Sequence, residues 1–129
     1  NRSQLIKKGA TTIIMDAYNA NPNSMEGALE NLKSVAGPKW VVLGDMKELG
    51  DDSHKEHVAL GQRLNGMDLE AIFLLGPEMK VAFDSCPKAQ HFEDKSRLKE
   101  ALKSVNSEGK TVLLKGSRSM GLEEVIDAL

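Results

Sequence analysis

The sequence is poor in the residues and runs that build disulfides, thiolate metal sites and membrane spans. Its 129 residues include a single cysteine, Cys86, which excludes an internal disulfide and any metal site built from several thiolates. No apolar run approaches the roughly 20 residues of a membrane-spanning helix, and no signal-peptide pattern opens the chain. We therefore expect a protein of the cytoplasm, a reducing compartment, with no membrane span.

An excess of charge of one sign is also missing. With 17 Lys and Arg residues against 19 Asp and Glu residues, the formal net charge is -2. Such a charge provides no field that would favour nucleic acid or an acidic membrane, so we expect neither as a partner. The 40% hydrophobic and 28% charged content is that of an ordinary globular protein, and the length suits one domain with a real core. This charge balance is compatible with binding of a small polar ligand.

Short apolar runs alternate with helical patterns along the chain. The predicted strands are residues 11–15, 40–43, 71–75, 89–92 and 111–114. The predicted helices are residues 24–35, 53–64, 78–84, 95–105 and 120–128. Five β-α units in succession predict an α/β fold, a Rossmann-like three-layer sandwich with a mainly parallel sheet. We expect a single domain over residues 1–129, with residues 1–9 as a lead-in segment.

Polar residues gather where the predicted strands end. The loops that follow the strands are residues 16–21, 44–50, 76–77, 91–93 and 115–119. The carboxyl ends of parallel strands share one edge of a sheet, and open α/β sheets bind their ligands in the crevice at that edge. The sequence therefore predicts a ligand site built from these loops.

The last of these loops has the composition of an anion site. Residues 115–118 leave a predicted strand and enter a predicted short helix, where free backbone N–H groups favour a carboxylate or phosphate. Arg118 can hold such a group with two parallel hydrogen bonds. The alternative is that Ser117 caps the helix while Lys115 and Arg118 are simply solvated. Neither a Walker spacing nor G-x-G-x-x-G is present, so we do not expect this domain to hold a nucleoside triphosphate by itself.

The loop after the second predicted strand carries Asp45 and Glu48, with His54 and His57 following. A metal site is one interpretation. However, the histidines lack the H-E-x-x-H spacing, and acids before a helix more often complement its dipole, so we expect no metal here. His57 lies in the first turns of its helix and can hydrogen-bond the Asp45 loop.

Four segments together carry a family resemblance. They are residues 16–22 (DAYNANP), 43–50 (LGDMKELG), 53–61 with His57, and 115–120 (KGSRSM). In this order they resemble the C-terminal domain of the Mur ligase family, in the branch that adds D-alanyl-D-alanine to UDP-N-acetylmuramoyl-tripeptide. The resemblance implies that the family's N-terminal UDP-substrate domain and central ATPase domain are absent from this chain, whose first residue is Asn1 rather than Met. It also implies that residues 1–9 form part of a hinge.

The resemblance further implies a reaction in peptidoglycan precursor synthesis. ATP would phosphorylate the tripeptide carboxylate, and the amine of D-alanyl-D-alanine would attack the acyl phosphate. ATP and Mg²⁺ would be bound mainly by the absent central domain, and the third residue of the tripeptide, lysine or diaminopimelate, would be read elsewhere. The full-length protein would be an ATP-dependent ligase, and the isolated domain would be inactive.

Carried over position by position, the resemblance gives three groups of site residues. The residues implied to contact ATP are Arg2, Asp16, Tyr18, Asn19 and Asn21. The residues implied to bind the dipeptide are Lys115, Ser117 and Arg118, in agreement with the anion site argued above. The residues that match family motifs and could shape the site are Asp45, Glu48 and His57.

Two other classes of protein are alternatives to a Mur ligase domain. A phosphoacceptor receiver module needs an aspartate at the end of the third strand, where this chain has Gly76 and Pro77. A free-standing small-molecule-binding domain has no such conflict, and it remains the alternative for the chain taken alone.

Overall fold

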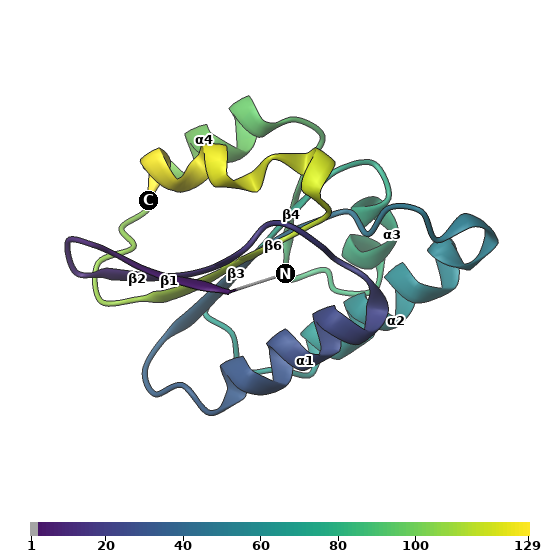
Figure 1. The fold of residues 1–129 in the computed structure, drawn as a ribbon, viewed down its shortest axis with the longest axis horizontal. Coiled ribbons are helices and arrows are strands. Elements are labelled where there is room, and N and C mark those ends of the chain that lie inside the picture. Colours follow the sequence, from purple (N-terminus) through teal and green to yellow (C-terminus); the bar gives the residue numbers. More distant parts are fainter. Residues whose placement is uncertain (1–2) are drawn as a thin grey trace.

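A six-stranded sheet forms the middle layer of the computed structural model, which describes residues 3–129 (Figure 1). Its strands are β1 (Gln4–Lys8), β2 (Thr11–Asp16), β3 (Lys39–Gly44), β4 (Ala71–Leu75), β5 (Gln90–Phe92) and β6 (Thr111–Lys115). Their order is β1-β2-β6-β3-β4-β5, and all neighbours pair in parallel except β1 with β2. The mainly parallel α/β architecture predicted from the sequence is confirmed.

Helices cover both faces of this sheet. The α-helices are α1 (Pro22–Lys33), α2 (Ser53–Asn65), α3 (Met79–Asp84) and α4 (Lys95–Lys103). The 3₁₀ segments are η1 (Gly50–Asp52), η2 (Arg118–Met120) and η3 (Leu122–Ala128). Helices α1, α2 and α3 pack on one face around the core that includes Met25, Leu64 and Met79, whereas α4 and η3 pack on the other around Leu98 and Val125 (Figure 1). Cys86 is buried in the first core, and burial raises the pKa of its thiol.

Local sequence explains how α1 begins directly after the first polar loop. The Asn21 side chain accepts from the Ser24 N–H at 2.8 Å, and the Ser24 hydroxyl accepts from the Asn21 N–H at 3.1 Å. This capping box, with Pro22 as the first helical residue, fixes where the chain turns from strand to helix. Met25, Leu29 and Leu32 then follow at helical spacing and are buried against the sheet.

Two predicted elements differ from the structure. Residues 4–8 of the expected lead-in form the edge strand β1, antiparallel to β2. Only Ile6 of this strand is half-buried, so its sequence lacks the alternation that marks a strand, and pairing with β2 decides its conformation. The helix predicted over 120–128 is the 3₁₀ segment η3, whose buried residues Leu122, Val125 and Ala128 recur every three positions, the period of that helix.

Along residues 3–129, we find no helix with both the length and the apolar character needed to cross a membrane.

Candidate functional site

The carboxyl ends of β2, β6 and β3 lie side by side because these strands are neighbours in the sheet. Their loops line an open cavity of about 610 Å³, here called the edge cavity, whose lining residues are 18–21, 47–49 and 117–119. The first, second and last polar loops of the sequence thus share one wall. The loops after β4 and β5 do not line it.

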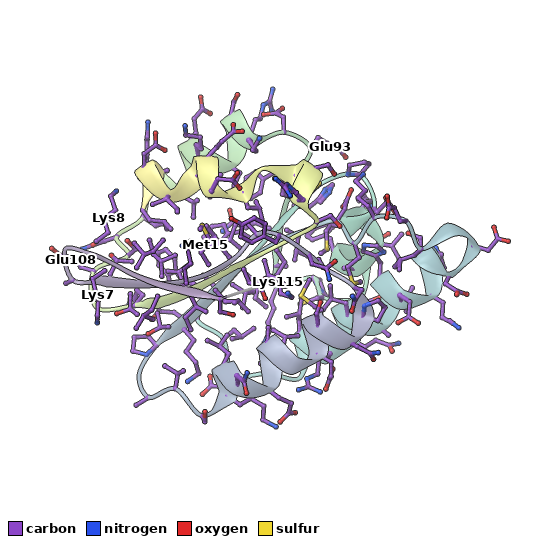
Figure 2. All side chains as sticks on the ribbon, viewed as in Figure 1. Lys7, Lys8, Met15, Glu93, Glu108 and Lys115 are labelled. Atoms are coloured by element: carbon purple, nitrogen blue, oxygen red, sulfur yellow. The ribbon has the colours of Figure 1, made fainter. Side chains whose placement is uncertain are left out.

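Lys115 and Asp16 form an ion pair at the carboxyl ends of β6 and β2, beside the loops that line the edge cavity. They are register partners on β6 and β2, and the Lys115 Nζ lies 2.6 Å from the Asp16 Oδ2 and donates to the Asn19 carbonyl at 2.9 Å. The Lys115 side chain is 1% exposed and lies inside the molecule (Figure 2). Its ammonium therefore holds the Asp16 loop, and direct binding of a dipeptide by Lys115 stays a prediction that this geometry does not favour.

Unlike the buried Lys115, Arg118 has an exposed side chain. Its guanidinium carbon lies 5.6 Å from the centroid of the Tyr18 ring, so the loops that follow β2 and β6 meet in a cation–π contact. Both side chains are exposed. Arg118 therefore remains accessible to an anionic ligand, with one face supported by an aromatic ring.

The structure changes the expected anion site in one respect. The helix that begins at Arg118 is the three-residue η2, too short for a helix dipole to bind an anion. The Ser117 N–H donates to the Asp45 carbonyl at 3.2 Å, and the Ser117 hydroxyl accepts from the Lys47 N–H at 2.9 Å. Ser117 thus joins two loops, and Arg118 carries the anion-binding capacity of this segment.

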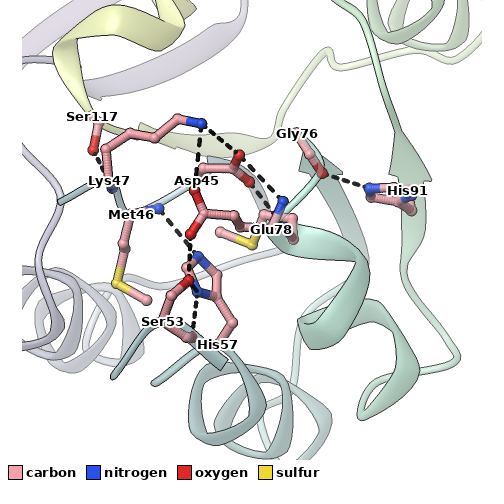
Figure 3. Close-up of polar contacts among 10 residues, drawn as sticks. Asp45, Met46, Lys47, Ser53, His57, Gly76, Glu78, His91 and Ser117 are labelled. Atoms are coloured by element: carbon pink, nitrogen blue, oxygen red, sulfur yellow. Dashed lines mark hydrogen bonds and ion pairs between the residues drawn. The ribbon is translucent and has the colours of Figure 1, made fainter. Parts of the chain in front are cut away.

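Asp45 is a buried carboxylate that fixes the start of α3. It accepts from the Met79 N–H at 2.9 Å and the Glu78 N–H at 3.3 Å, and its Oδ2 lies 3.2 Å from the Lys47 Nζ (Figure 3). Gly76 makes room for it: φ there is +118°, and a Cβ would stand 2.4 Å from the Asp45 carboxylate. These contacts support the site-shaping role predicted for Asp45.

His57 holds the same loop from α2. Its Nε2 accepts from the Met46 N–H at 3.2 Å, and its Nδ1 lies 2.8 Å from the Ser53 carbonyl (Figure 3). A backbone N–H can only donate and a carbonyl can only accept, so the buried ring is the neutral Nδ1–H tautomer. His57 shapes the loop and lies outside the lining of the edge cavity.

Glu78 completes this network and was not singled out by the sequence. Its carboxylate accepts from the Ser53 hydroxyl and lies 3.4 Å from the Lys47 Nζ. The Ser53 hydrogen bond, then Lys47, lowers the pKa of Glu78 despite burial. Burial acts to lower the pKa of Lys47, but Asp45 and Glu78 outweigh it and the pKa is raised. The only sequence signal was an acid at the start of a helix, after Gly76 and Pro77.

The remaining predicted residues have mixed outcomes. The Asn21 side-chain oxygen is occupied as the cap of α1, and Asn19 gives its carbonyl to Lys115 while its side chain is exposed. Arg2 lies outside the described residues. Asp52 precedes α2 and makes no side-chain capping bond. Within residues 3–129 no three His, Cys, Asp or Glu side chains are grouped so as to hold a metal ion.

Glu48 lines the edge cavity with an unusual backbone. Its φ is +65°, the left-handed region that side chains other than glycine rarely adopt. No local sequence signal marks this position. The neighbouring Gly50 has a similar φ of +58°, and there glycine removes the steric cost.

Comparison with known proteins gives a consistent picture. Residues 1–118 match the model of the Mur ligase, glutamate ligase domain. The chain is 35% identical over 119 residues to UDP-N-acetylmuramoyl-tripeptide--D-alanyl-D-alanine ligase of Escherichia coli K12, covering 91% of this chain and 26% of the relative. It superposes on MurF from Acinetobacter baumannii with a TM-score of 0.85 at 31% identity, covering 96% of this chain and 29% of that one.

MurF ligase from Thermotoga maritima, solved in complex with ADP, superposes with a TM-score of 0.83 at 31% identity and covers the same shares. The chain thus spans under a third of the length of these relatives. The matched residues include all three loops of the edge cavity up to Arg118. The chain belongs to the Mur ligase family.

Proposed function

We propose that this chain is the acceptor-binding C-terminal domain of a ligase that joins D-alanyl-D-alanine to UDP-N-acetylmuramoyl-tripeptide at the expense of ATP, in cytoplasmic peptidoglycan precursor synthesis. The names of the similar proteins support the reaction. We assign the binding of the UDP substrate and of most of the ATP to the parts of those relatives that this chain does not cover. The other domains of the same enzyme and the two peptide substrates are the proposed partners.

The observation that carries this proposal is the accessible Arg118 on the wall of the edge cavity. A guanidinium pairs with a planar carboxylate through two parallel hydrogen bonds, and the D-alanyl-D-alanine carboxylate is such a group. The Tyr18 ring 5.6 Å away and the hydrogen bonds of Ser117 limit the movement of this loop. A preformed cation reduces the conformational entropy lost when the dipeptide binds.

The nucleotide is proposed to approach from the Asp16 side of the edge cavity. Lys115 occupies Oδ2 of Asp16, which leaves Oδ1 able to accept from a ribose hydroxyl. The exposed Tyr18 and Asn19 lie on the same loop, and Asn21 would contribute only its amide nitrogen because its oxygen caps α1. The assignment of Arg2 to the ATP phosphates rests on the family resemblance. Residues 3–129 hold no cluster of three His, Cys, Asp or Glu side chains, and we assign the magnesium ion to the absent domains.

In the proposed reaction the dipeptide amine attacks the acyl phosphate and the C–N bond forms as phosphate leaves. This chain's residues bind the dipeptide through its carboxylate and hold the amine toward the absent domains. Correct orientation accounts for much of the rate of such a transfer, and closure of the domain over the other two would exclude water from the acyl phosphate.

The test is Arg118→Ala in the full-length enzyme. The loss of a charge-assisted pair predicts a KM for D-alanyl-D-alanine raised about tenfold or more, with the KM for ATP changed less than about twofold. Steady-state kinetics with each substrate varied in turn measures both. Arg97→Ala, which removes an exposed arginine on α4, is the matched control and should change neither. Equal effects of Arg118→Ala on both KM values would contradict the assignment.

A further inference from the structure

The lining of the edge cavity includes three charged residues: Lys47, Glu48 and Arg118. The Lys47 ammonium is already neutralised by Asp45 at 3.2 Å and Glu78 at 3.4 Å. Neither Glu48 nor Arg118 has an ion-pair partner among residues 3–129. The edge cavity therefore presents one unpaired anion and one unpaired cation.

The backbone at Glu48 is held in an unfavourable conformation, while its side chain is exposed. A φ of +65° disfavours any residue with a Cβ, and such strain persists only where the surroundings over-determine the conformation. Here the two preceding residues are fixed, because the Met46 N–H is bound by His57 and the Lys47 N–H by Ser117. Glycine would relieve the strain, but it would supply no carboxylate to the cavity wall.

We propose that Glu48 binds the ammonium group of a zwitterionic acceptor whose carboxylate is bound by Arg118. This inference rests on the proposed function and deepens it, because it assigns the second charge of the dipeptide. A dipeptide extends no more than about 7 Å, so a cavity of about 610 Å³ has room for both ends. The proposal concerns docking of the protonated amine and includes no covalent step.

The experiment compares two analogues of D-alanyl-D-alanine that each lack one charge. N-propionyl-D-alanine has hydrogen in place of the ammonium, and D-alanine ethylamide has hydrogen in place of the carboxylate. Three constants, the KM of D-alanyl-D-alanine and the inhibition constants of the two analogues, are measured on the full-length enzyme and on its Glu48→Gln and Arg118→Ala variants. Glutamine keeps the shape of the side chain and removes its charge. Asp51→Asn, three residues away and exposed, is the control for general loss of negative charge.

We expect Glu48→Gln to weaken D-alanyl-D-alanine and D-alanine ethylamide by about threefold to tenfold, the range for a charge-assisted contact at a partly exposed site. N-propionyl-D-alanine should bind this variant and the unchanged enzyme equally, and the effect should shrink at high salt. Asp51→Asn should leave all three constants unchanged.

The contrary outcomes are distinguishable. If Glu48→Gln changes all three constants equally or none, while Arg118→Ala still selectively weakens the ligands with a carboxylate, the role of Glu48 is wrong and the proposed function stands. If Arg118→Ala also fails to discriminate, the dipeptide is not bound in the edge cavity, and both proposals fail together.

Discussion

For Lys115, the sequence predicted the position in the fold but not the contacts of the side chain. The sequence placed it directly after a predicted strand, and in the structure it is the last residue of β6. It could not show that its ammonium is bound by Asp16 and by the Asn19 carbonyl, because that pairing joins residues 99 positions apart. The same long-range contact also occupies half of the Asp16 carboxylate.

This buried pair predicts a large effect on stability. Lys115→Met keeps the length of the side chain but leaves Asp16 without its cation, and removing one partner of a buried ion pair costs about 3 kcal/mol or more. Lys110→Met removes a lysine whose partner, Glu70, is 47% exposed, and it should cost much less than Lys115→Met. Urea unfolding of the two variants checks the difference, and similar values would show that the Lys115 pair adds nothing.

At the scale of elements, the loop after β3 owes its shape to contacts from α2, α3 and the segment after β6. His57, Glu78 and Ser117 come from these three places. Sequence reasoning predicted that His57 could reach this loop, because a helix start near the carboxyl edge of the sheet was visible from its pattern. It missed Glu78, since only the three-dimensional approach of α3 to α2 brings that carboxylate to Ser53 and Lys47.

The network also predicts a pH dependence with a defined sign. The lowered pKa of Glu78 means that the folded protein binds this proton less tightly than the unfolded chain does. Its contribution is therefore present above the ordinary value of 4.5 and is lost as the pH falls through the lowered pKa. The raised pKa of Lys47 acts in the opposite direction, with stability present below 10.5 and lost as the pH rises through the raised pKa.

We expect Glu78→Gln to flatten the acid side of the stability curve. Between pH 7 and pH 3 the variant should lose less unfolding free energy than the unchanged protein, by under about 1 kcal/mol because the side chain is one-third exposed. Urea unfolding at several pH values measures this, with the exposed Glu93→Gln as control. A variant with the same acid slope as the unchanged protein would contradict the assigned role of Glu78.

For the whole molecule, the alternation of strands and helices predicted the layers, and the strand-end loops predicted the edge of the site. The order of the strands could not be predicted, because the pairing of β6 between β2 and β3 is set by contacts far apart in the chain. That order decides which loops meet. It also fixes Gln4–Lys8 in a ladder with β2, so bending of the expected hinge at those residues would break hydrogen bonds of the sheet.

Taken alone, this chain is expected to fold without cleaving ATP. Both faces of its sheet are covered by helices and two closed cores, which favours independent folding, yet residues 3–129 hold no metal cluster and the sequence has no Walker loop. We expect the 129-residue chain to form no ADP from ATP and magnesium with both peptide substrates present, measured by a coupled assay. Titration with D-alanyl-D-alanine should instead shift the amide NMR signals of residues 18–21, 47–49 and 117–119. ADP formation would show that the chain carries its own ATPase site, whereas an unperturbed edge cavity would mean that dipeptide binding requires the other domains to be in place.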